Sequence, residues 1–262
     1  MSGTTARDGA FVQSLERGLL VIRALAPPQP QALSEVARAT GLSRAAARRF
    51  LLTLEHLGYV RQTRGRFTLT PRVLELGYAY LSSLTLPEVA QPHLERLVEQ
   101  VHESSSVSVL DGDDVVYVAR VPTRRIMSVT ISVGTRFPAY ATSMGRVLLS
   151  AMPDEQVDAT LSRADLRKLT GRTITSTDVL REAIRQVRRQ GYAIVDQELE
   201  VGLRSIAVPI RDPAGAVVAA VNLSTQASRT TVADMKRRLL PPLRETAAAV
   251  QCDLGGARPT GR

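Results

Sequence analysis

The spacing of hydrophobic residues predicts two short helices joined by a tight turn near the start of the chain. In the first helix, Leu33, Val36 and Ala37 recur at helical spacing. Gly41 follows as a residue that tolerates the left-handed backbone at a helix end. Ser34 offers a side-chain oxygen to cap the start. The pattern therefore indicates a short amphipathic helix that ends before residue 41.

The second helix begins after Ser43, whose hydroxyl can accept an amide hydrogen of the first turn. Its apolar residues recur at the spacing of one helix face and form a single stripe. The stripe consists of Ala47, Phe50, Leu51, Leu54 and Leu57. Two amphipathic helices separated by such a turn are typical of a helix-turn-helix.

Two short β-prone segments follow and predict a hairpin. Residues 59–61 and 67–69 flank the loop 62–66, in which Gly65 permits the positive φ that a tight turn needs. A hairpin directly after a helix-turn-helix is a wing. Residues 11–70 are therefore predicted to form a winged helix-turn-helix domain.

Several residues of these elements lie away from the apolar stripe and are suited to contact DNA. A helix whose first turns carry cations and small residues can enter a major groove of about 12 Å and reach guanine edges. Arginines on an isolated hairpin usually belong to a solvated turn, whereas a wing behind such a helix has phosphates or the minor groove within reach. The candidate DNA-binding residues are Ser43, Arg44, Ala45, Arg48, Arg49, Arg61, Arg64 and Arg66.

Beyond residue 84 the pattern alternates between strands and helices. The predicted strands are residues 106–110, 115–120, 127–133, 192–197, 205–211 and 216–225. The predicted helices are residues 86–104 with a kink at Pro92, 144–151, 154–161, 178–190 and a last helix from Val232 that Pro241 and Pro242 interrupt. A mixed β-sheet with helices on its faces makes the fold class α+β.

The remaining segments define the domain organisation. A helix with Leu15, Leu19, Ile22 and Leu25 on one side is expected to support the helix-turn-helix, and a helix from Pro71 connects it to the second domain. The predicted segments are a disordered lead at residues 1–10, the winged helix-turn-helix at 11–70, a linker helix at 71–84, the second domain at 85–254 and a loose tail at 255–262.

Charge is distributed unevenly and points to an acidic polymer as partner. The net charge is +9, and the first 83 residues alone carry 11 arginines against 5 acidic residues, a net charge of +6. This excess coincides with the predicted winged helix-turn-helix, as expected for a domain that binds nucleic acid. Genomic composition contributes to the preference for arginine over lysine, so the position of the charge is more informative than its total.

Composition excludes several classes of site. The single cysteine, Cys252, leaves no intramolecular disulfide, and three scattered histidines form no ligand set. Asp111, Asp113 and Asp114 fall in a predicted hairpin turn, where aspartate is favoured for local hydrogen bonds, so no metal and no cofactor is expected. Motifs of hydrolases, nucleotide-binding enzymes and zinc peptidases are missing, and no apolar stretch approaches the ~20 residues of a membrane span. We therefore expect a cytoplasmic protein without a membrane partner that is not an enzyme.

Two stretches of the second domain carry polar groups that a hydrophobic core does not need. Thr142 and Ser143 open a predicted helix whose free amides suit a carboxylate ligand, although the same residues equally suit ordinary helix capping. Ser205, Asn222 and Ser224 alternate with small residues on predicted strands, so their polar groups can share one sheet face.

Arg204 leaves two roles open. Its guanidinium could hold a carboxylate ligand through two hydrogen bonds. Because Asp196, Glu198 and Glu200 lie close in the sequence, an internal ion pair is an equally suitable role.

Several long motifs, in the same order, resemble the IclR family of bacterial transcriptional regulators across residues 12–254. The motifs ATSMGR, GYAIVDQELEVGLRSIAVPIRD and AAVNLS are most similar to the subgroup that controls aromatic-acid catabolism through the β-ketoadipate pathway, the PcaR, PcaU and PobR type. The resemblance implies an N-terminal winged helix-turn-helix, a linker helix and a GAF-like effector-binding domain. It also implies dimers or tetramers that bind pseudo-palindromic operator DNA.

The resemblance further implies an effector pocket. By position, its lining would consist of Ile126, Val129, Ser143, Met144, Asp196, Ser205, Asn222 and Ser224. Members that respond to glyoxylate carry a cysteine at the position of Ser205, so its replacement here argues against the same small keto-acid. We expect a small organic acid, either aromatic or similar to β-ketoadipate, and Arg204 is a further candidate to bind it.

The sequence favours a ligand-responsive regulator of double-stranded operator DNA over other classes. The alternative within the family is a repressor of another carbon-source pathway, because these residues do not fix activation or repression. A small-molecule enzyme with a basic accessory domain would turn over its acid without DNA. An architectural protein would bind all DNA sequences alike at physiological salt.

Overall fold

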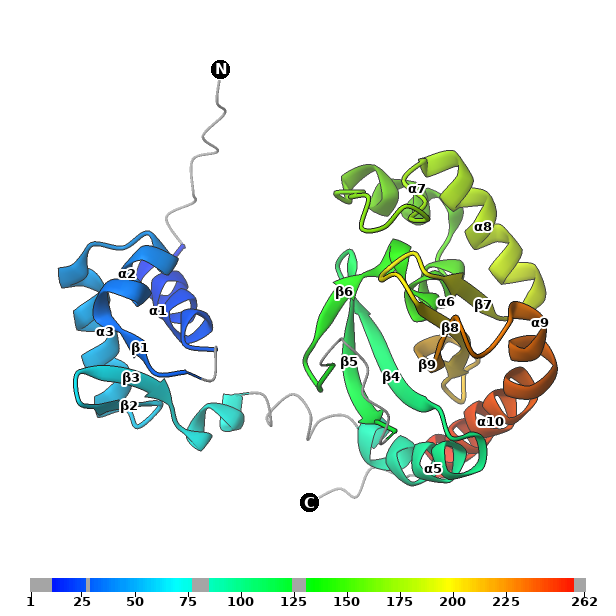
Figure 1. The fold of residues 1–262 in the computed structure, drawn as a ribbon, viewed down its shortest axis with the longest axis horizontal. Coiled ribbons are helices and arrows are strands. Elements are labelled where there is room, and N and C mark those ends of the chain that lie inside the picture. Colours follow the sequence, from blue (N-terminus) through cyan, green and yellow to red (C-terminus); the bar gives the residue numbers. More distant parts are fainter. Residues whose placement is uncertain (1–10, 27–28, 77–84, 124–130, 257–262) are drawn as a thin grey trace. The chain divides into compact units, whose positions relative to one another are not determined.

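The structure is a computed structural model that describes residues 11–26, 29–76, 85–123 and 131–256. The chain divides into two compact units, Met1–Ser83 and Leu84–Arg262 (Figure 1). The expected lead at residues 1–10 and most of the expected tail at 255–262 lie outside the described residues. Of the predicted linker helix, Pro71–Val73 forms a 3₁₀ turn and residues 74–76 are helical, while residues 77–84 lie outside as well.

In its described part, the first unit packs helices against a small sheet. The elements are α1 (Gln13–Ala24), β1 (Gln31–Ala32), α2 (Leu33–Thr40), α3 (Arg44–His56), β2 (Val60–Thr63) and β3 (Arg66–Leu69). The strands lie antiparallel in the order β1-β3-β2. The shared core contains Val21, Leu25, Val36, Leu51, Leu54, Val60 and Phe67. This arrangement confirms the predicted winged helix-turn-helix.

The start of α2 differs from the prediction. Ser34 was expected to cap the helix, but it lies inside the first turn, after Leu33. The carboxylate of Glu35 instead accepts the amide hydrogen of Ala32 at 2.6 Å. A carboxylate at the third helical position can satisfy the amide ahead of the helix, so the serine is not needed there. Gly41 ends α2 with a φ of 66°, as predicted.

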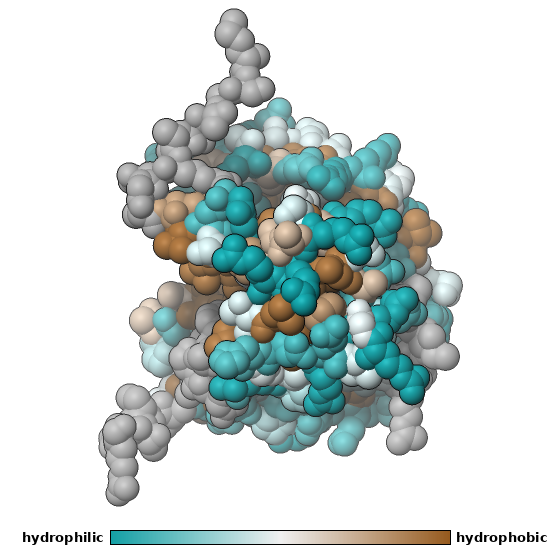
Figure 2. Space-filling view, turned by 90° about the vertical axis from the view of Figure 1, so that its left-hand side faces the viewer, coloured by the Kyte–Doolittle hydropathy of each residue, from teal (hydrophilic) through white to brown (hydrophobic). Residues whose placement is uncertain are grey.

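Only the C-terminal part of the side predicted for α1 faces the core, where Leu25 is buried and Ile22 packs against the core cluster. Val21 and Leu25 are buried, whereas Leu15 and Leu19 are 63% and 50% exposed. Leu15 and Leu19 therefore contribute little to the core of this unit. Figure 2 shows hydrophobic residues at the surface among hydrophilic ones.

The second unit is built on an antiparallel sheet with the order β6-β5-β4-β9-β8-β7 among the described strands. The strands are β4 (Ser104–Asp111), β5 (Asp114–Val121), β6 (Arg136–Pro138), β7 (Ala193–Asp196), β8 (Leu203–Arg211) and β9 (Val217–Gln226). The expected mixed sheet is corrected, since every described pair is antiparallel. Short turns join β4 to β5 and β8 to β9, and such hairpins can only produce antiparallel pairs. The predicted strand at 127–133 falls mostly outside the described residues.

Helices cover both faces of this sheet. They are α5 (Thr85–Val101), α6 (Ser143–Ser150), α7 (Asp154–Arg163), α8 (Thr177–Gln190), α9 (Val232–Asp234) and α10 (Leu240–Gly256). Helices α5 and α10 pack together on one face, while α6 lies on the other face with α8 against it (Figure 1). Among the described helices, none is both long enough and apolar enough to cross a membrane.

The last helix is not interrupted at Pro241 and Pro242. A π turn, Met235–Leu239, follows α9 and leads directly into α10, whose first turn contains both prolines. Proline lacks an amide hydrogen, and a first turn does not require one. The change of hydrogen-bond spacing at the π turn therefore allows a continuous helical path through residues that usually break one.

Candidate DNA-binding surface and effector site

The first turns of α3 present cations on a helix whose other side is anchored. Ser43 caps the helix from an extended backbone, and its Oγ accepts the amide hydrogen of Ala46 at 3.2 Å. Ala47 is fully buried in the core. The predicted DNA-binding residues of this helix, Arg44, Ala45, Arg48 and Arg49, are all exposed. The helix therefore has one face held by the core and one basic face open to a groove.

The wing is tighter than the sequence predicted. Strands β2 and β3 are joined by only Arg64 and Gly65, which have φ values of 50° and 77°. Positive φ at both central residues is the pattern of a type I′ hairpin turn. Arg61 and Arg64 are exposed. Within the described part of the chain, neither forms an ion pair, so both cations are available to phosphate.

Arg66 is placed differently from the other wing arginines. It belongs to β3, and its Nη1 donates to the carbonyl of Pro30 at 3.0 Å and to the carboxylate of Glu35 at 3.4 Å. The pair is exposed, so it contributes little to stability. The contact nevertheless directs the guanidinium toward the start of α2 rather than the tip of the wing.

The N-terminal end of α6 combines a capped first turn with a buried hydroxyl that has no hydrogen-bond partner among the described residues. Thr142 Oγ1 accepts the amide hydrogen of Gly145 at 3.0 Å, so of the two candidates Thr142 and Ser143, Thr142 caps the helix. Ser143 is 1% exposed, and its Oγ is buried without a hydrogen-bond partner among the described residues. A buried hydroxyl without a partner is costly. This end of the helix is therefore suited to a polar ligand.

Two residues, Gly145 and Arg146, fix the position of this helix end. A Cβ on Gly145 would lie 2.1 Å from the carbonyl oxygen of Ala139, so only glycine allows this close approach. Arg146 donates to both carboxylate oxygens of Glu198, at 2.9 and 2.5 Å, and both side chains are buried. Arg146 Nε also donates to the carbonyl of Tyr140 at 3.0 Å. The first turn of α6 is thus held by backbone packing and by a two-point ion pair.

A row of polar side chains crosses the sheet on the face that carries α6; we call Arg120, Ser106, Asn222, Ser224 and Ser205 the polar row. The strand register places Ser106 between Arg120 and Asn222, and Ser224 opposite Ser205. Arg120 Nη1 donates to Ser106 Oγ at 3.2 Å. Asn222 accepts the amide hydrogen of Ser106 at 3.0 Å and donates to Ser224 Oγ at 3.1 Å. The row links four strands into one polar surface.

Apolar and aromatic groups border the polar row. Met144 is fully buried, and Ser108 Oγ donates to its sulfur at 3.2 Å, which places α6 on this face. The rings of Tyr117 and Phe137 meet edge to face with centroids 5.7 Å apart. Burial raises the pKa of Tyr117 to about 12, and the charge of Arg120 opposes this shift. The phenol therefore stays protonated beside a polar surface.

Three residues of this surface, Ser106, Arg120 and Tyr117, are absent from the set predicted from sequence. One signal was available, because Ser106 and Ser108 alternate along the predicted strand 106–110 and must share a face. Of the predicted effector residues, Ile126 and Val129 lie outside the described residues. The structure brings Ser143 and Met144 onto the same face as Ser205, Asn222 and Ser224.

Asp196 and Arg204 lie on the other face of the sheet. They are opposite each other in the β7–β8 ladder, and Arg204 precedes Ser205, so alternation turns it away from the polar row. Arg204 donates through Nε to Asp196 at 2.7 Å and through Nη1 to the carbonyls of Ala227 and Thr230. The hydrogen bond from Arg204 holds the pKa of the Asp196 carboxyl below its usual value. Of the two roles left open for Arg204, the structure shows the internal ion pair, and the placement of Asp196 beside the polar row is corrected.

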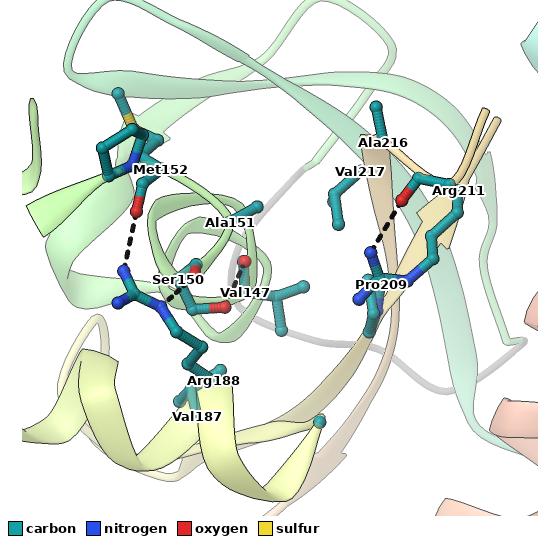
Figure 3. Close-up of a pocket in the computed structure, with 13 residues that line it drawn as sticks. Val147, Ser150, Ala151, Met152, Val187, Arg188, Pro209, Arg211, Ala216 and Val217 are labelled. Atoms are coloured by element: carbon teal, nitrogen blue, oxygen red, sulfur yellow. Dashed lines mark hydrogen bonds between the residues drawn. The ribbon is translucent and has the colours of Figure 1, made fainter.

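A hollow of about 590 Å³ lies at the other end of α6 (Figure 3). Its walls come from the last turns of α6 and α8 and from β8 and β9. Arg188 lines this hollow and donates to the carbonyls of Ser150 at 2.8 Å and Met152 at 2.7 Å. Helix C-termini carry partial negative charge, and here an arginine of the chain already neutralises it. At this hollow the chain itself therefore satisfies the polar end of the helix.

The acidic turn between β4 and β5 is bound by arginines. Asp111 and Asp114 accept from Arg136 at 2.6 and 3.1 Å, and Asp113 accepts from Arg163 at 2.5 Å. Within the described residues, no group of three or more potential ligands is arranged to hold a metal ion. The aspartates thus fix the turn to neighbouring elements.

Two domain families, both from IclR regulators, match the chain. The IclR helix-turn-helix domain matches residues 14–64, and the C-terminal domain of the bacterial transcriptional regulator IclR matches residues 78–252. The Pca regulon regulatory protein of Pseudomonas putida is 48% identical over 238 residues, which cover 90% of this chain and 82% of that protein. Both units therefore have counterparts in known regulators.

Solved structures agree with these matches. A putative transcriptional regulator of Rhodococcus sp. RHA1 is 60% identical, with a TM-score of 0.85 over 95% of this chain and 100% of its own. An IclR homologue of Microbacterium hydrocarbonoxydans, complexed with 4-hydroxybenzoate, is 27% identical, with a TM-score of 0.80 over 92% of this chain and 98% of its own. With a helix-turn-helix domain and regulators as relatives, the protein binds DNA and is not an enzyme. The chain belongs to the IclR family of bacterial transcriptional regulators.

Proposed function

We propose that the protein controls genes of aromatic-acid catabolism, and that an organic acid bound by its second unit changes how its first unit binds operator DNA. The observation that carries this proposal is the buried hydroxyl of Ser143, which has no hydrogen-bond partner among the described residues and opens α6, the helix that packs on the sheet face bearing the polar row. An effector can act only by binding one arrangement of the protein more tightly than another. The assignment of residues 11–70 to operator binding, 71–84 to the linker and 85–254 to the effector belongs to the same proposal.

Relatives support an aromatic effector. The 48% identical relative is named for the Pca regulon, and a structural neighbour was solved with 4-hydroxybenzoate. A benzoate-type acid combines a ring with a carboxylate. The border of Met144, Tyr117 and Phe137 offers apolar contact to the ring, and the polar row offers hydrogen bonds.

Self-association is a further part of the proposal. Leu15 and Leu19 lie one turn apart on α1 and are at least half exposed. A second copy of this surface would remove them from water and present a second α3 to the other half of a pseudo-palindromic site. Sedimentation of the wild-type chain and of Leu15→Ser should differ, with the variant shifted toward the monomer.

DNA footprinting tests the proposed function. We expect the cytoplasmic protein to protect promoter DNA near its own gene, and 4-hydroxybenzoate, protocatechuate or β-ketoadipate to change that protection. Absence of a protected site under all three acids would overturn the proposal. Changed protection with an unrelated sugar acid alone would support the repressor of another carbon-source pathway.

The assignment of Arg48 to the major groove and of Arg64 to the wing predicts different losses of DNA affinity for the two variants. Arg48→Ala should weaken operator binding about 10- to 100-fold and random DNA binding much less, because a base contact carries sequence preference. Arg64→Ala should weaken both DNAs and make the salt dependence shallower by about one phosphate contact. Arg66→Ala is the matched control, since its guanidinium is held by Glu35. Equal losses on both DNAs for Arg48→Ala would contradict the groove assignment.

A further inference from the structure

We propose that Arg120 holds the carboxylate of the effector and so selects acids over neutral ligands of the same shape. This inference rests on the proposed function and names the charged contact at that site. The polar row otherwise consists of serines and an asparagine, none of which carries a charge to balance a carboxylate.

The position of Arg120 follows from the strand register. It stands opposite Ser106 at the end of the polar row, and its Nη1 donates to Ser106 Oγ at 3.2 Å. Ser106 is in turn bound to Asn222, so Arg120 is connected to the centre of the row. A guanidinium has five donor hydrogens in a fixed fork. One contact to a hydroxyl leaves most of them available to a ligand.

Arg120 differs from the other sheltered arginines of the second unit. Of the arginines described there, Arg120, Arg146, Arg181 and Arg204 are not exposed. Arg146 pairs with Glu198, Arg181 with Asp158 and Asp178, and Arg204 with Asp196. Among the described residues, no carboxylate pairs with Arg120.

A sheltered guanidinium without a carboxylate partner is unfavourable. Burial lowers the pKa of Arg120, although a guanidinium starts so high that it stays charged. Carboxylates bind a guanidinium through two parallel hydrogen bonds, and these are stronger where water is partly excluded. An incoming carboxylate would therefore supply the counter-charge that Glu198, Asp158 and Asp196 supply to the other three.

The ring of the effector would then extend over the row. Tyr117 lies on the same face as Arg120, and its ring contacts Phe137. Ser143 Oγ, at the start of the helix that packs on this face, has no hydrogen-bond partner among the described residues. We assign the carboxylate to Arg120 and the polar ring substituents to the uncharged groups. The ligand class is a hydroxylated benzoate or an acid of similar length.

Calorimetry with a matched pair of ligands tests this assignment. The probes are 4-hydroxybenzoate and its neutral analogue 4-hydroxybenzamide, titrated into the full chain. Wild type should prefer the acid. Arg120→Gln should lower affinity for the acid about 10- to 100-fold, the range for a charged hydrogen-bonded contact, and leave the amide nearly unchanged. Arg120→Lys should restore part of the preference, because it keeps the charge without the fork.

Arg211→Gln is the control. Arg211 is an exposed arginine of the hollow at the other end of α6, and it donates to the carbonyl of Gly215 at 2.9 Å. Its variant should keep the wild-type preference for the acid. Retained operator binding and a wild-type circular dichroism spectrum show that a variant is folded, and Arg120→Met replaces Arg120→Gln if the latter is not.

The outcomes separate the two proposals. If wild type binds the acid and the Arg120 variants keep the same acid-to-amide ratio, the assignment of Arg120 is wrong while the proposed function stands. If wild type binds the amide as tightly as the acid, the site does not recognise charge and the assignment is likewise wrong. If wild type binds none of 4-hydroxybenzoate, protocatechuate and β-ketoadipate, the proposed function itself fails.

Discussion

The two ends of helix α6 lie against the same sheet, but their polar groups are satisfied differently. At the C-terminal end, Arg188 of the same chain donates to the carbonyls of Ser150 and Met152. At the N-terminal end, Thr142 satisfies one amide, while the buried hydroxyl of Ser143 has no partner among the described residues. The comparison teaches that a hollow alone does not identify a ligand site. A buried polar group without a hydrogen-bond partner is the better indicator of a ligand site, because a ligand that binds there supplies a hydrogen bond that the chain does not.

The largest effect should come from the ion pair that holds the N-terminal end in place. Glu198→Leu leaves Arg146 buried without its counter-charge, and breaking a buried pair in this way costs about 3–5 kcal/mol. Urea unfolding of the second unit in the full chain measures the loss. Replacing both partners by apolar residues, as in Arg146→Met with Glu198→Leu, should recover most of it, because no buried charge remains.

An exposed pair provides the control for this prediction. Glu182 and Arg189 form an ion pair at 2.8 Å with both side chains largely exposed. Glu182→Leu should change stability little, since solvent screens such pairs. If Glu198→Leu proved no more harmful than Glu182→Leu, the buried pair would not be what fixes this end of α6.

Much of this comparison could be anticipated from local sequence. Thr142 and Ser143 were the two candidates to cap α6, and the alternation of Ser205, Asn222 and Ser224 indicated a shared sheet face. Helix caps and strand alternation depend on neighbours a few residues away, so a single sequence contains them. The helix-turn-helix was predictable for the same reason.

Arg120 could not be found in this way. Tyr117 and Arg120 are three residues apart, which in a regular strand places them on opposite faces. A bulge in the pairing of β4 with β5, at Val107 and Ser108, shifts the register and turns both toward α6. Bulges depend on the partner strand, so the alternation of one strand does not reveal them.

Short elements and distant partners account for the other differences. Strand β1 has two residues and β6 has three, too few for a period to be visible. The family resemblance placed Asp196 in the effector pocket, yet the β7–β8 register pairs it with Arg204 on the opposite face. In each case a contact between strands decides the outcome.

A smaller effect, of opposite sign in two measurements, is expected for Ser143→Ala. Removing a buried hydroxyl without a partner should raise stability by up to about 1 kcal/mol. The same change removes a hydrogen bond to the effector, so affinity for 4-hydroxybenzoate should fall roughly 2- to 12-fold. Thermal unfolding and calorimetry on one preparation provide both values.

Ser150→Ala is the matched substitution at the other end of α6. Ser150 Oγ already donates to the carbonyl of Val147 at 2.7 Å, so its removal should slightly lower stability and leave ligand affinity unchanged. Ser143→Ala without any loss of affinity would remove the N-terminal end from the site. A loss of affinity with Ser150→Ala instead would move the site to the hollow of Figure 3.

The smallest effect on stability should follow from Arg188→Gln. This change removes the guanidinium that donates to the carbonyls at the C-terminal end of α6. Hydrogen bonds from Arg188 and then Arg185 hold the pKa of Asp154 below its usual value. A lowered carboxyl pKa means that the pair stabilises the fold above the usual pKa and that this contribution is lost as pH falls. In the variant the pKa of Asp154, followed by NMR, should rise toward its usual value. The free energy of unfolding should then fall less steeply as the pH is lowered. Affinity for 4-hydroxybenzoate should stay unchanged. A clear loss would show that the C-terminal end of α6 takes part in ligand binding as well as in structure.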